Sequence, residues 1–169
     1  DKTFGLPLTL SQSAQISYLA AQPSAEDSYT LYGHAGLRVW DAEQGIDVTF
    51  NYGIFNFTDD FSLRFTQGKT DYIVLPIATE LFIEDYQHRG LIQEIVLTTD
   101  SLQRARMWSL LLENIQPENR VYRYNAFRNN CSTRPLDLYL ETLTILFSEK
   151  GATDSVSFAF ASGDEIGRA

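Results

Sequence analysis

Cys131 is the residue of this chain that is best suited to nucleophilic chemistry. It is the only cysteine among 169 residues, and it lies in the run Asn129-Asn130-Cys131-Ser132-Thr133-Arg134, directly before Pro135. Proline lacks an N–H group and is tolerated only in the first turn of a helix. A helix is expected there because apolar residues recur at three- and four-residue steps, at Leu136, Tyr139, Leu140, Leu143 and Phe147. The sequence therefore places Cys131 at or just before the N-terminus of a helix.

A helix N-terminus favours an anion, and the thiolate is the reactive form of cysteine. An unperturbed thiol has a pKa of about 8.5, so only a few per cent of it is ionised at neutral pH. We expect the helix N-terminus and the flanking Arg128 and Arg134 to lower the pKa of Cys131. The alternative is a small buried hydrophobic side chain, which is the commoner role of a lone cysteine.

A cysteine nucleophile needs a base, usually histidine, and a polar group that orients the imidazole ring. His88 precedes the helix-ending Gly90 and is typical of a helix C-terminus. His34 follows Gly33 at the start of an expected strand, so we predict that His34 is the base. Asn51 is the preferred third group, and Asp47 is the second choice.

Other chemistry has weaker support. His34, His88 and Cys131 match no zinc-ligand spacing, so we expect neither a metal nor a cofactor. Ser132 as the nucleophile would have no base nearby in the sequence.

The elements that position these residues follow from hydrophobic periodicity. Strands are predicted over 15–21, 35–40, 46–52, 71–76, 91–98 and 121–124. Helices are predicted over 57–67 and 78–89, after a capping box that begins at Asp100, and after Cys131. The polar turn 41–45 would pair its two strands antiparallel and bring His34 and Asn51 to the same end. Strands dominate early and helices late, which predicts an α+β fold with an antiparallel sheet packed against helices.

Composition narrows the range of partners. The length fits one domain, and 44% hydrophobic residues indicate a folded chain. A net charge of −9 argues against nucleic acid or an anionic membrane surface as an electrostatic partner. No run of about 18 apolar residues is present, so nothing in the sequence is expected to span a bilayer.

Five motifs, taken in order, resemble one known family. They are LYGHAGLRV (31–39), FNYGIFNF (50–57), GKTDY (68–72), YRYN (122–125) and NNCSTR (129–134). This combination resembles the periplasmic N-terminal domain of the Lnb-type lipoprotein N-acyltransferases, over roughly residues 14–145.

The resemblance implies a circularly permuted papain-like fold of the NlpC/P60 and lecithin:retinol acyltransferase kind, with the histidine strand before the cysteine helix. It implies Cys131 as the nucleophile and His34 as its base, whereas Asn51 depends on the strand pairing. Supporting or oxyanion-binding roles are expected for Tyr32, Arg128, Asn130, Ser132 and Arg134, with N–H groups at the start of the cysteine helix as oxyanion donors.

The implied activity is acyl transfer from a phospholipid, through a Cys131 thioester, to the N-terminal amine of a diacylglyceryl lipoprotein. It would take place in the periplasm, at the outer face of the inner membrane in the bacterial cell envelope. We expect residues 1–13 to be an N-terminal extension, 14–147 the catalytic domain, and 148–169 a tail that leads to a membrane-contacting segment absent from this chain.

Two other functional classes fit the same residues. A hydrolase would resolve the thioester with water, as a peptidoglycan amidase or peptidase of NlpC/P60 type or as a thiol lipase. A non-catalytic binding module would keep Cys131 buried and unreactive.

Overall fold

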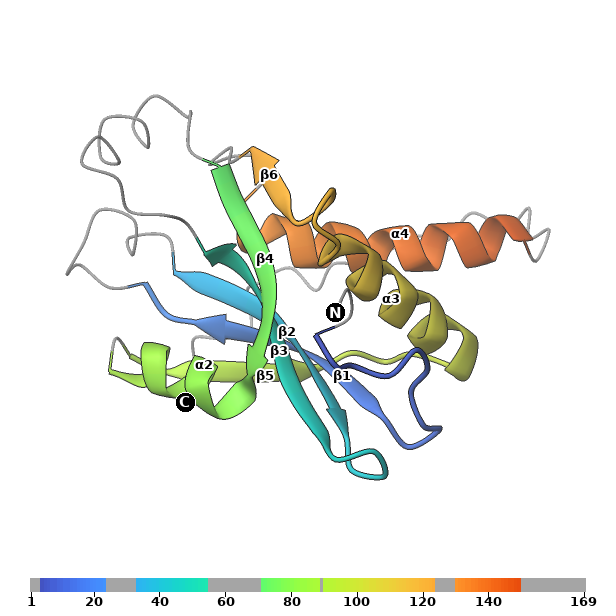
Figure 1. The fold of residues 1–169 in the computed structure, drawn as a ribbon, viewed down its shortest axis with the longest axis horizontal. Coiled ribbons are helices and arrows are strands. Elements are labelled where there is room, and N and C mark those ends of the chain that lie inside the picture. The colour runs from blue at the N-terminus through green and yellow to red at the C-terminus, as the bar shows by residue number, and fades with distance from the viewer. Residues whose placement is uncertain (1–3, 24–32, 55–70, 89, 124–129, 150–169) are drawn as a thin grey trace, which may run out of the picture.

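A central antiparallel sheet organises the chain (Figure 1). The computed structural model describes residues 4–23, 33–54, 71–88, 90–123 and 130–149. Within these ranges the sheet has six strands in the order β5-β1-β2-β3-β4-β6, and each neighbouring pair is antiparallel. The strands are β1 (Gln15–Ala21), β2 (His34–Asp41), β3 (Ile46–Ile54), β4 (Asp71–Ala78), β5 (Ile92–Val96) and β6 (Val121–Arg123). Three helices accompany the sheet in the same ranges: α2 (Thr79–Gln87), α3 (Ser101–Asn114) and α4 (Thr133–Glu149).

These elements confirm the predicted α+β class and its antiparallel sheet. The β2–β3 hairpin pairs Gly36 with Asn51 and Asp41 with Ile46, and the predicted turn ends at Gly45, which has a positive φ of 66°. The capping box at the start of α3 is also present, because Asp100 and Gln103 each bond the backbone N–H of the other. The predicted helix 57–67, Tyr32, Arg128 and residues 150–169 lie outside the described residues.

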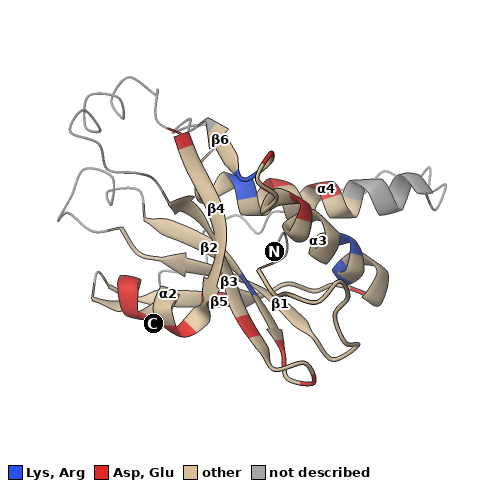
Figure 2. Cartoon of the chain, viewed as in Figure 1, with Lys and Arg blue, Asp and Glu red and all other residues tan. Residues whose placement is uncertain are grey.

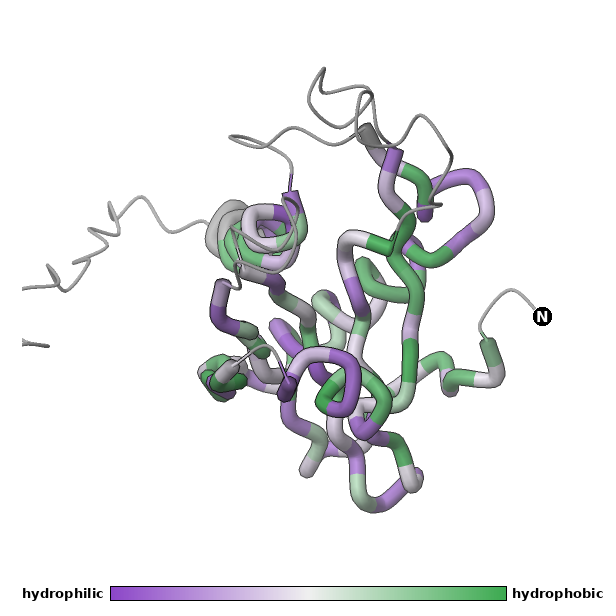
Figure 3. Tube along the Cα trace, turned by 90° about the vertical axis from the view of Figure 1, so that its left-hand side faces the viewer, coloured by the Kyte–Doolittle hydropathy of each residue, from purple (hydrophilic) through white to green (hydrophobic). Residues whose placement is uncertain are grey.

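The two faces of the sheet are covered by different helices. Successive side chains of a strand point to opposite faces, and hydrophobic and hydrophilic stretches are interspersed along the described chain (Figure 3). One face carries Leu37, Phe50 and Tyr52, which pack with residues of α3 and α4. The other face carries Thr49, whose hydroxyl hydrogen-bonds that of Thr79 in α2 at 3.0 Å.

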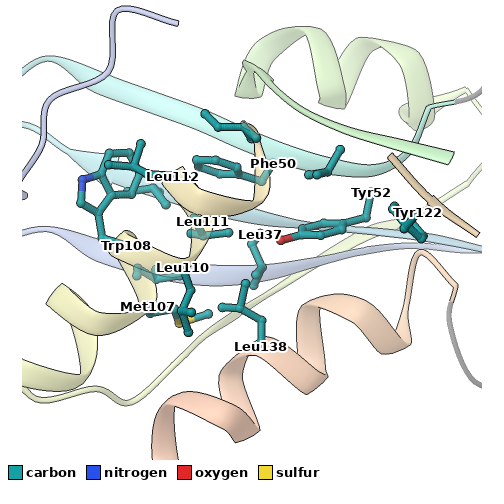
Figure 4. Close-up of a cluster of buried hydrophobic side chains, with 14 of the residues drawn as sticks. Leu37, Phe50, Tyr52, Met107, Trp108, Leu110, Leu111, Leu112, Tyr122 and Leu138 are labelled. Atoms are coloured by element: carbon teal, nitrogen blue, oxygen red, sulfur yellow. The ribbon is translucent and has the colours of Figure 1, made fainter. Parts of the chain in front are cut away.

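The larger core lies between the sheet and α3 (Figure 4). Trp108 of α3 contacts Phe50 edge-on, with ring centroids 5.8 Å apart. Its indole N–H donates to the carbonyl of Pro7 at 3.0 Å. The N-terminal residues therefore pack against the same helix that closes the core, and α4 joins it through the buried Leu138.

The apolar face predicted for the helix after Cys131 is wrong in part. Leu136 and Leu140 are 44% and 45% exposed, whereas Leu138 and Thr142 are buried. Apolar residues occupy nearly every other position from 136 to 147, so the sequence offers more than one apolar face. Packing against α3 selects the face that contains Leu138.

Charge is spread thinly over the surface. Acidic residues outnumber basic ones by 22 to 13, and they occur on several elements, including α2 and the end of the β2–β3 hairpin (Figure 2). Among the described residues, no helix is both long enough and apolar enough to cross a membrane.

Asp41 ties the N-terminal residues to this hairpin. Its buried carboxylate accepts hydrogen bonds from the Ser11 N–H at 2.8 Å and the Ser11 hydroxyl at 2.7 Å. The side chain and the N–H of Gln44 also donate to it. Burial alone would raise the pKa of Asp41, but these hydrogen bonds outweigh it and hold the pKa below its usual value.

We predict that Asp41→Asn destabilises the fold by about 1–3 kcal/mol at pH 7, because an NH₂ group would face donors instead of accepting from them. A carboxyl whose folded-state pKa is lowered stabilises the fold above its unfolded pKa of about 3.9 and loses this effect as the pH falls through its folded pKa. The difference in free energy of unfolding between the unmodified protein and Asp41→Asn should therefore be largest at pH 7 and shrink below about pH 4. Urea unfolding at pH 7 and pH 3 measures it, with the exposed Asp137→Asn as control. An unchanged difference at low pH would contradict the role of the ionised carboxylate.

Candidate active site

Asn130 caps the first turn of α4 and thereby fixes the position of Cys131. The Asn130 side-chain oxygen accepts from the N–H groups of Ser132 at 2.8 Å and Thr133 at 2.9 Å. In return the Thr133 hydroxyl accepts from the Asn130 N–H at 3.0 Å, and the Arg134 N–H donates to the Asn130 carbonyl. This is the N-cap arrangement, so Cys131 is the first residue of the helical turn. The two N–H groups that follow Cys131 are engaged by the cap.

His34 begins β2 directly after a turn that requires glycine. Gly33 has a φ of +71°, and a Cβ atom there would lie 2.8 Å from the carbonyl oxygen of Ala21. The Gly33 carbonyl oxygen also lies 4.0 Å from the Cys131 sulfur. Two segments therefore approach closely at this glycine, and the approach brings this end of β2 to the start of α4.

Asn51 of β3 orients the His34 ring. The Nε2 atom of His34 lies 2.5 Å from Oδ1 of Asn51, and Asn51 is buried. An amide oxygen only accepts hydrogen bonds. Nε2 is therefore assigned the ring proton, and Nδ1 holds the lone pair in the neutral imidazole.

Gly53 is the point at which His34 and Cys131 meet. A Cβ atom at Gly53 would lie 2.9 Å from Cε1 of His34 and 3.2 Å from Cβ of Cys131. The two side chains therefore border the same position. Cε1 of His34 and Cβ of Cys131 can be no farther apart than the sum of these two distances. Gly53 has a φ of +123°, and the pairing of β3 with β4 shifts register there. The bulge turns the strand end so that the base and the thiol share one space.

Burial dominates the electrostatics of the thiol. It raises the pKa of Cys131, and the Ser132 hydroxyl and the N–H groups of Ala35, Cys131 and Ser132 offset this only in part. This direction is opposite to the lowering expected from a helix N-terminus, because desolvation of the thiolate outweighs the nearby N–H dipoles. At rest the thiol keeps its proton at neutral pH.

Aromatic side chains from α2 form one wall of the site. The His34 ring stacks on Tyr86, with centroids 4.5 Å apart and an interplanar angle of 6°, and Phe82 lies 5.9 Å away. Stacking fixes the plane of the imidazole ring, while Asn51 fixes its rotation within that plane.

Two tyrosines and an arginine surround the start of α4. The Arg134 guanidinium lies 5.0 Å over the ring of Tyr122. The Tyr18 hydroxyl donates to the Ser132 carbonyl at 3.4 Å. Burial raises the pKa of Tyr18, and the proximity of Cys131 contributes in the same direction.

The structure brings together Cys131, His34 and Asn51, with Asn130, Ser132 and Arg134 beside them. It separates the alternatives. Asp47 lies opposite Trp40, towards the turn, and forms an ion pair with Arg38 at 2.7 Å. His88 is exposed at the end of α2. No group of three or more His, Cys, Asp or Glu side chains in the described part of the chain could hold a metal ion.

Sequence reasoning missed Gly53, Tyr18, Tyr86 and Tyr122 as parts of this site. Tyr18 and Tyr86 carry no signal beyond that of a strand or an amphipathic helix. Gly53 lies in the strand pattern that begins at Ile46, directly after Tyr52. A glycine inside a strand pattern indicates a bulge or a close approach of two segments. That signal could have identified it.

We predict that alkylation of Cys131 by iodoacetamide accelerates with a midpoint above about pH 8.5, because burial raises the pKa of the thiol. Measuring the rate constant from pH 5 to pH 10 tests this, and Cys131→Ala gives the blank because the chain has no other cysteine. A rate that is already at its plateau at pH 6 would instead show a resting thiolate–imidazolium pair.

We predict that Gly53→Ala slows modification of Cys131, because the added methyl group would press on Cε1 of His34 and Cβ of Cys131. Gly45→Ala is the matched control: Gly45 also has a positive φ, but its Cβ position meets nothing within 4 Å. Gly45→Ala should lose roughly 1–2 kcal/mol of stability from its left-handed backbone conformation. Gly53→Ala should lose at least as much, because its positive φ is also unfavourable and the methyl group meets His34. Equal reactivity of Cys131 in the two variants would contradict the shared space.

The matching family model is the Lnb N-terminal periplasmic domain, which covers residues 9–149. No curated protein and no solved structure gives a match. The matched region contains β1 to α4 and with them His34, Asn51, Gly53 and Cys131. The chain therefore belongs to the Lnb lipoprotein-processing family and is its N-terminal periplasmic domain.

Proposed function

We propose that this domain is a cysteine-dependent acyltransferase with a permuted papain-like site at the outer face of the inner membrane. It moves a fatty acyl chain from a phospholipid, through a thioester on Cys131, to the N-terminal amine of a diacylglyceryl lipoprotein. The observation that carries the proposal is the meeting of Cys131 and His34 at Gly53, with Asn51 bonded to Nε2 of His34. Membership of the Lnb family supports a lipoprotein as the acceptor.

The first step forms the thioester. Because the buried thiol is protonated at rest, His34 Nδ1 takes its proton as the sulfur attacks the ester carbonyl carbon. The S–C bond forms, and the carbonyl electron pair moves to the oxygen. The carbonyl then re-forms as the ester C–O bond breaks, and the imidazolium returns its proton to the leaving lysophospholipid hydroxyl. Asn51 holds the ring and stabilises its positive charge through Nε2–H.

The second step uses the acceptor amine. The neutral α-amine attacks the thioester carbonyl carbon, an N–C bond forms, and His34 takes one proton from the nitrogen. The S–C bond breaks, and the sulfur regains that proton from His34. The products are an amide and the free thiol. Water in place of the amine would give a fatty acid and make the domain a hydrolase.

We predict that incubation with phospholipid vesicles adds one acyl mass to the protein, detected as an intact mass, and that Cys131→Ala abolishes the addition. His34→Ala should slow it by about 10²-fold or more, because the thiol loses its base. Asn51→Ala should slow it by up to about 10²-fold through misorientation of the ring. His88→Ala is the matched histidine control and should react like the unmodified protein.

The acceptor and the acyl source are tested separately. A diacylglyceryl-cysteine peptide should discharge the acyl-enzyme to an N-acyl peptide faster than buffer does. The same peptide without phospholipid shows whether its own ester can serve as the donor. Discharge to free fatty acid at the same rate with and without peptide would favour a thiol lipase. No acyl adduct together with cleavage of muropeptides would favour the amidase.

A further inference from the structure

Tyr122 of β6 has a buried hydroxyl group without a hydrogen-bond partner. The side chain is 7% exposed, and its hydroxyl oxygen is one of two buried side-chain polar atoms among the described residues that lack a hydrogen-bond partner. Neighbouring tyrosines are different: the Tyr18 hydroxyl donates to the Ser132 carbonyl, and the Tyr52 hydroxyl accepts from Asn114 at 3.2 Å. Burying an unpaired hydroxyl destabilises a fold. The unpaired Tyr122 hydroxyl therefore points to a ligand that supplies the missing acceptor.

Contacts on both sides hold Tyr122 beside the thiol. Its ring stacks on that of Tyr72, the opposite residue on β4, with centroids 6.0 Å apart. Tyr72 is also the third neighbour of the empty position at Gly53, 3.5 Å from it. On the other side lies Arg134, three residues after Cys131 and therefore on the same face of the first turn of α4. In Figure 4, Tyr122 lies at the end of the core cluster nearest the start of α4.

The hydroxyl remains a donor across the working pH range. Burial is the main cause that raises the pKa of Tyr122, and the nearby Cys131 raises it further. Arg134 lowers the pKa but offsets only part of this rise. A neutral phenol can donate one hydrogen bond. Cys131 packs against the core cluster to which Tyr122 belongs, so the phenol and the thiol lie on the same side of the sheet.

The proposed acyl transfer needs such a donor. Attack by the sulfur moves negative charge onto the carbonyl oxygen, which preorganised donors must stabilise. Of the first N–H groups of α4, those of Ser132 and Thr133 already donate to Asn130, so the cap competes with any oxyanion for them. Within this turn the backbone thus offers the N–H of Cys131, and a side-chain hydroxyl beside it would add a second donor.

We propose that the Tyr122 hydroxyl donates a hydrogen bond to the carbonyl oxygen of the acyl group while Cys131 forms and breaks the thioester. The assignment rests on the proposed acyltransferase function. The oxygen accepts this bond most strongly when it carries the negative charge, so the contact stabilises the transition state more than the bound ester. Arg134 is a positioning residue, because its guanidinium packs on the ring and fixes the direction of the hydroxyl.

The test compares Tyr122→Phe with Tyr52→Phe, which removes a buried tyrosine hydroxyl that has a partner. The acylation rate of Cys131 is measured as the burst of nitrophenolate from para-nitrophenyl octanoate. Tyr122→Phe should slow the burst by about 10²-fold or more, whereas Tyr52→Phe should leave it unchanged. Alkylation by iodoacetamide passes through no oxyanion, so both variants should react with it at the rate of the unmodified protein.

The melting temperatures of the two variants distinguish a catalytic role of Tyr122 from a structural one. Tyr122→Phe should melt at the same temperature as the unmodified protein or higher, since it loses an unpaired hydroxyl, and Tyr52→Phe should melt lower. If Cys131 is acylated in the unmodified protein and equally fast in Tyr122→Phe, the role of Tyr122 is overturned and the proposed acyltransferase function is not. Slower alkylation in step with slower acylation would also overturn it, because the effect would then lie in the thiol. An unmodified protein that is acylated neither by this ester nor by phospholipid vesicles would overturn the proposed function and the assignment with it.

Discussion

The site depends on glycine at position 53, where any side chain would meet both His34 and Cys131. His34 lies on β2, next to the helix α2 that covers one face of the sheet, whereas Cys131 directly precedes α4, which packs with the other face. Side chains on opposite faces of an intact sheet do not meet. At Gly53 the strand bulges, adopts a backbone conformation that favours glycine, and leaves a space that both side chains border. The hairpin, the cap of α4 and the turn at Gly33 all bring their residues to this point.

Burial sets the kind of activation that the thiol can have. A helix N-terminus stabilises a thiolate, but its partial charges are shared with the cap, because Asn130 accepts from two of the N–H groups. Desolvation then determines the direction of the pKa shift. A protonated thiol beside an oriented imidazole favours general-base activation, as in serine enzymes, over a resting ion pair. Asn51 therefore matters most when His34 becomes charged, which happens only during the reaction.

The sequence predicted the features that local chemistry determines. The six strands, the β2–β3 hairpin, the Asp100 cap and the position of Cys131 before a helix all follow from periodicity, turn residues and capping preferences. The choice of Asn51 over Asp47 followed from their distances to the turn of one hairpin, because Asp47 lies nearer the turn and Asn51 lies at the end that carries His34. Contacts between distant segments could not be predicted in this way. Tyr18, Tyr86 and Tyr122 reach the site through packing, and the buried face of α4 was ambiguous because its apolar residues are too frequent to define one stripe.

The raised pKa of Cys131 also bears on the choice between transfer and hydrolysis. A thioester is lost to water unless the amine reaches it first, so a transferase must limit the access of water to the bound acyl group. The partial burial that disfavours the thiolate also limits solvent around the sulfur. Exclusion of water further strengthens each hydrogen bond to the carbonyl oxygen, since the local dielectric constant falls. In the proposed mechanism a thiol that is protonated at rest is thus compatible with efficient transfer. The same burial protects the thioester from water and strengthens the hydrogen bonds that stabilise its formation.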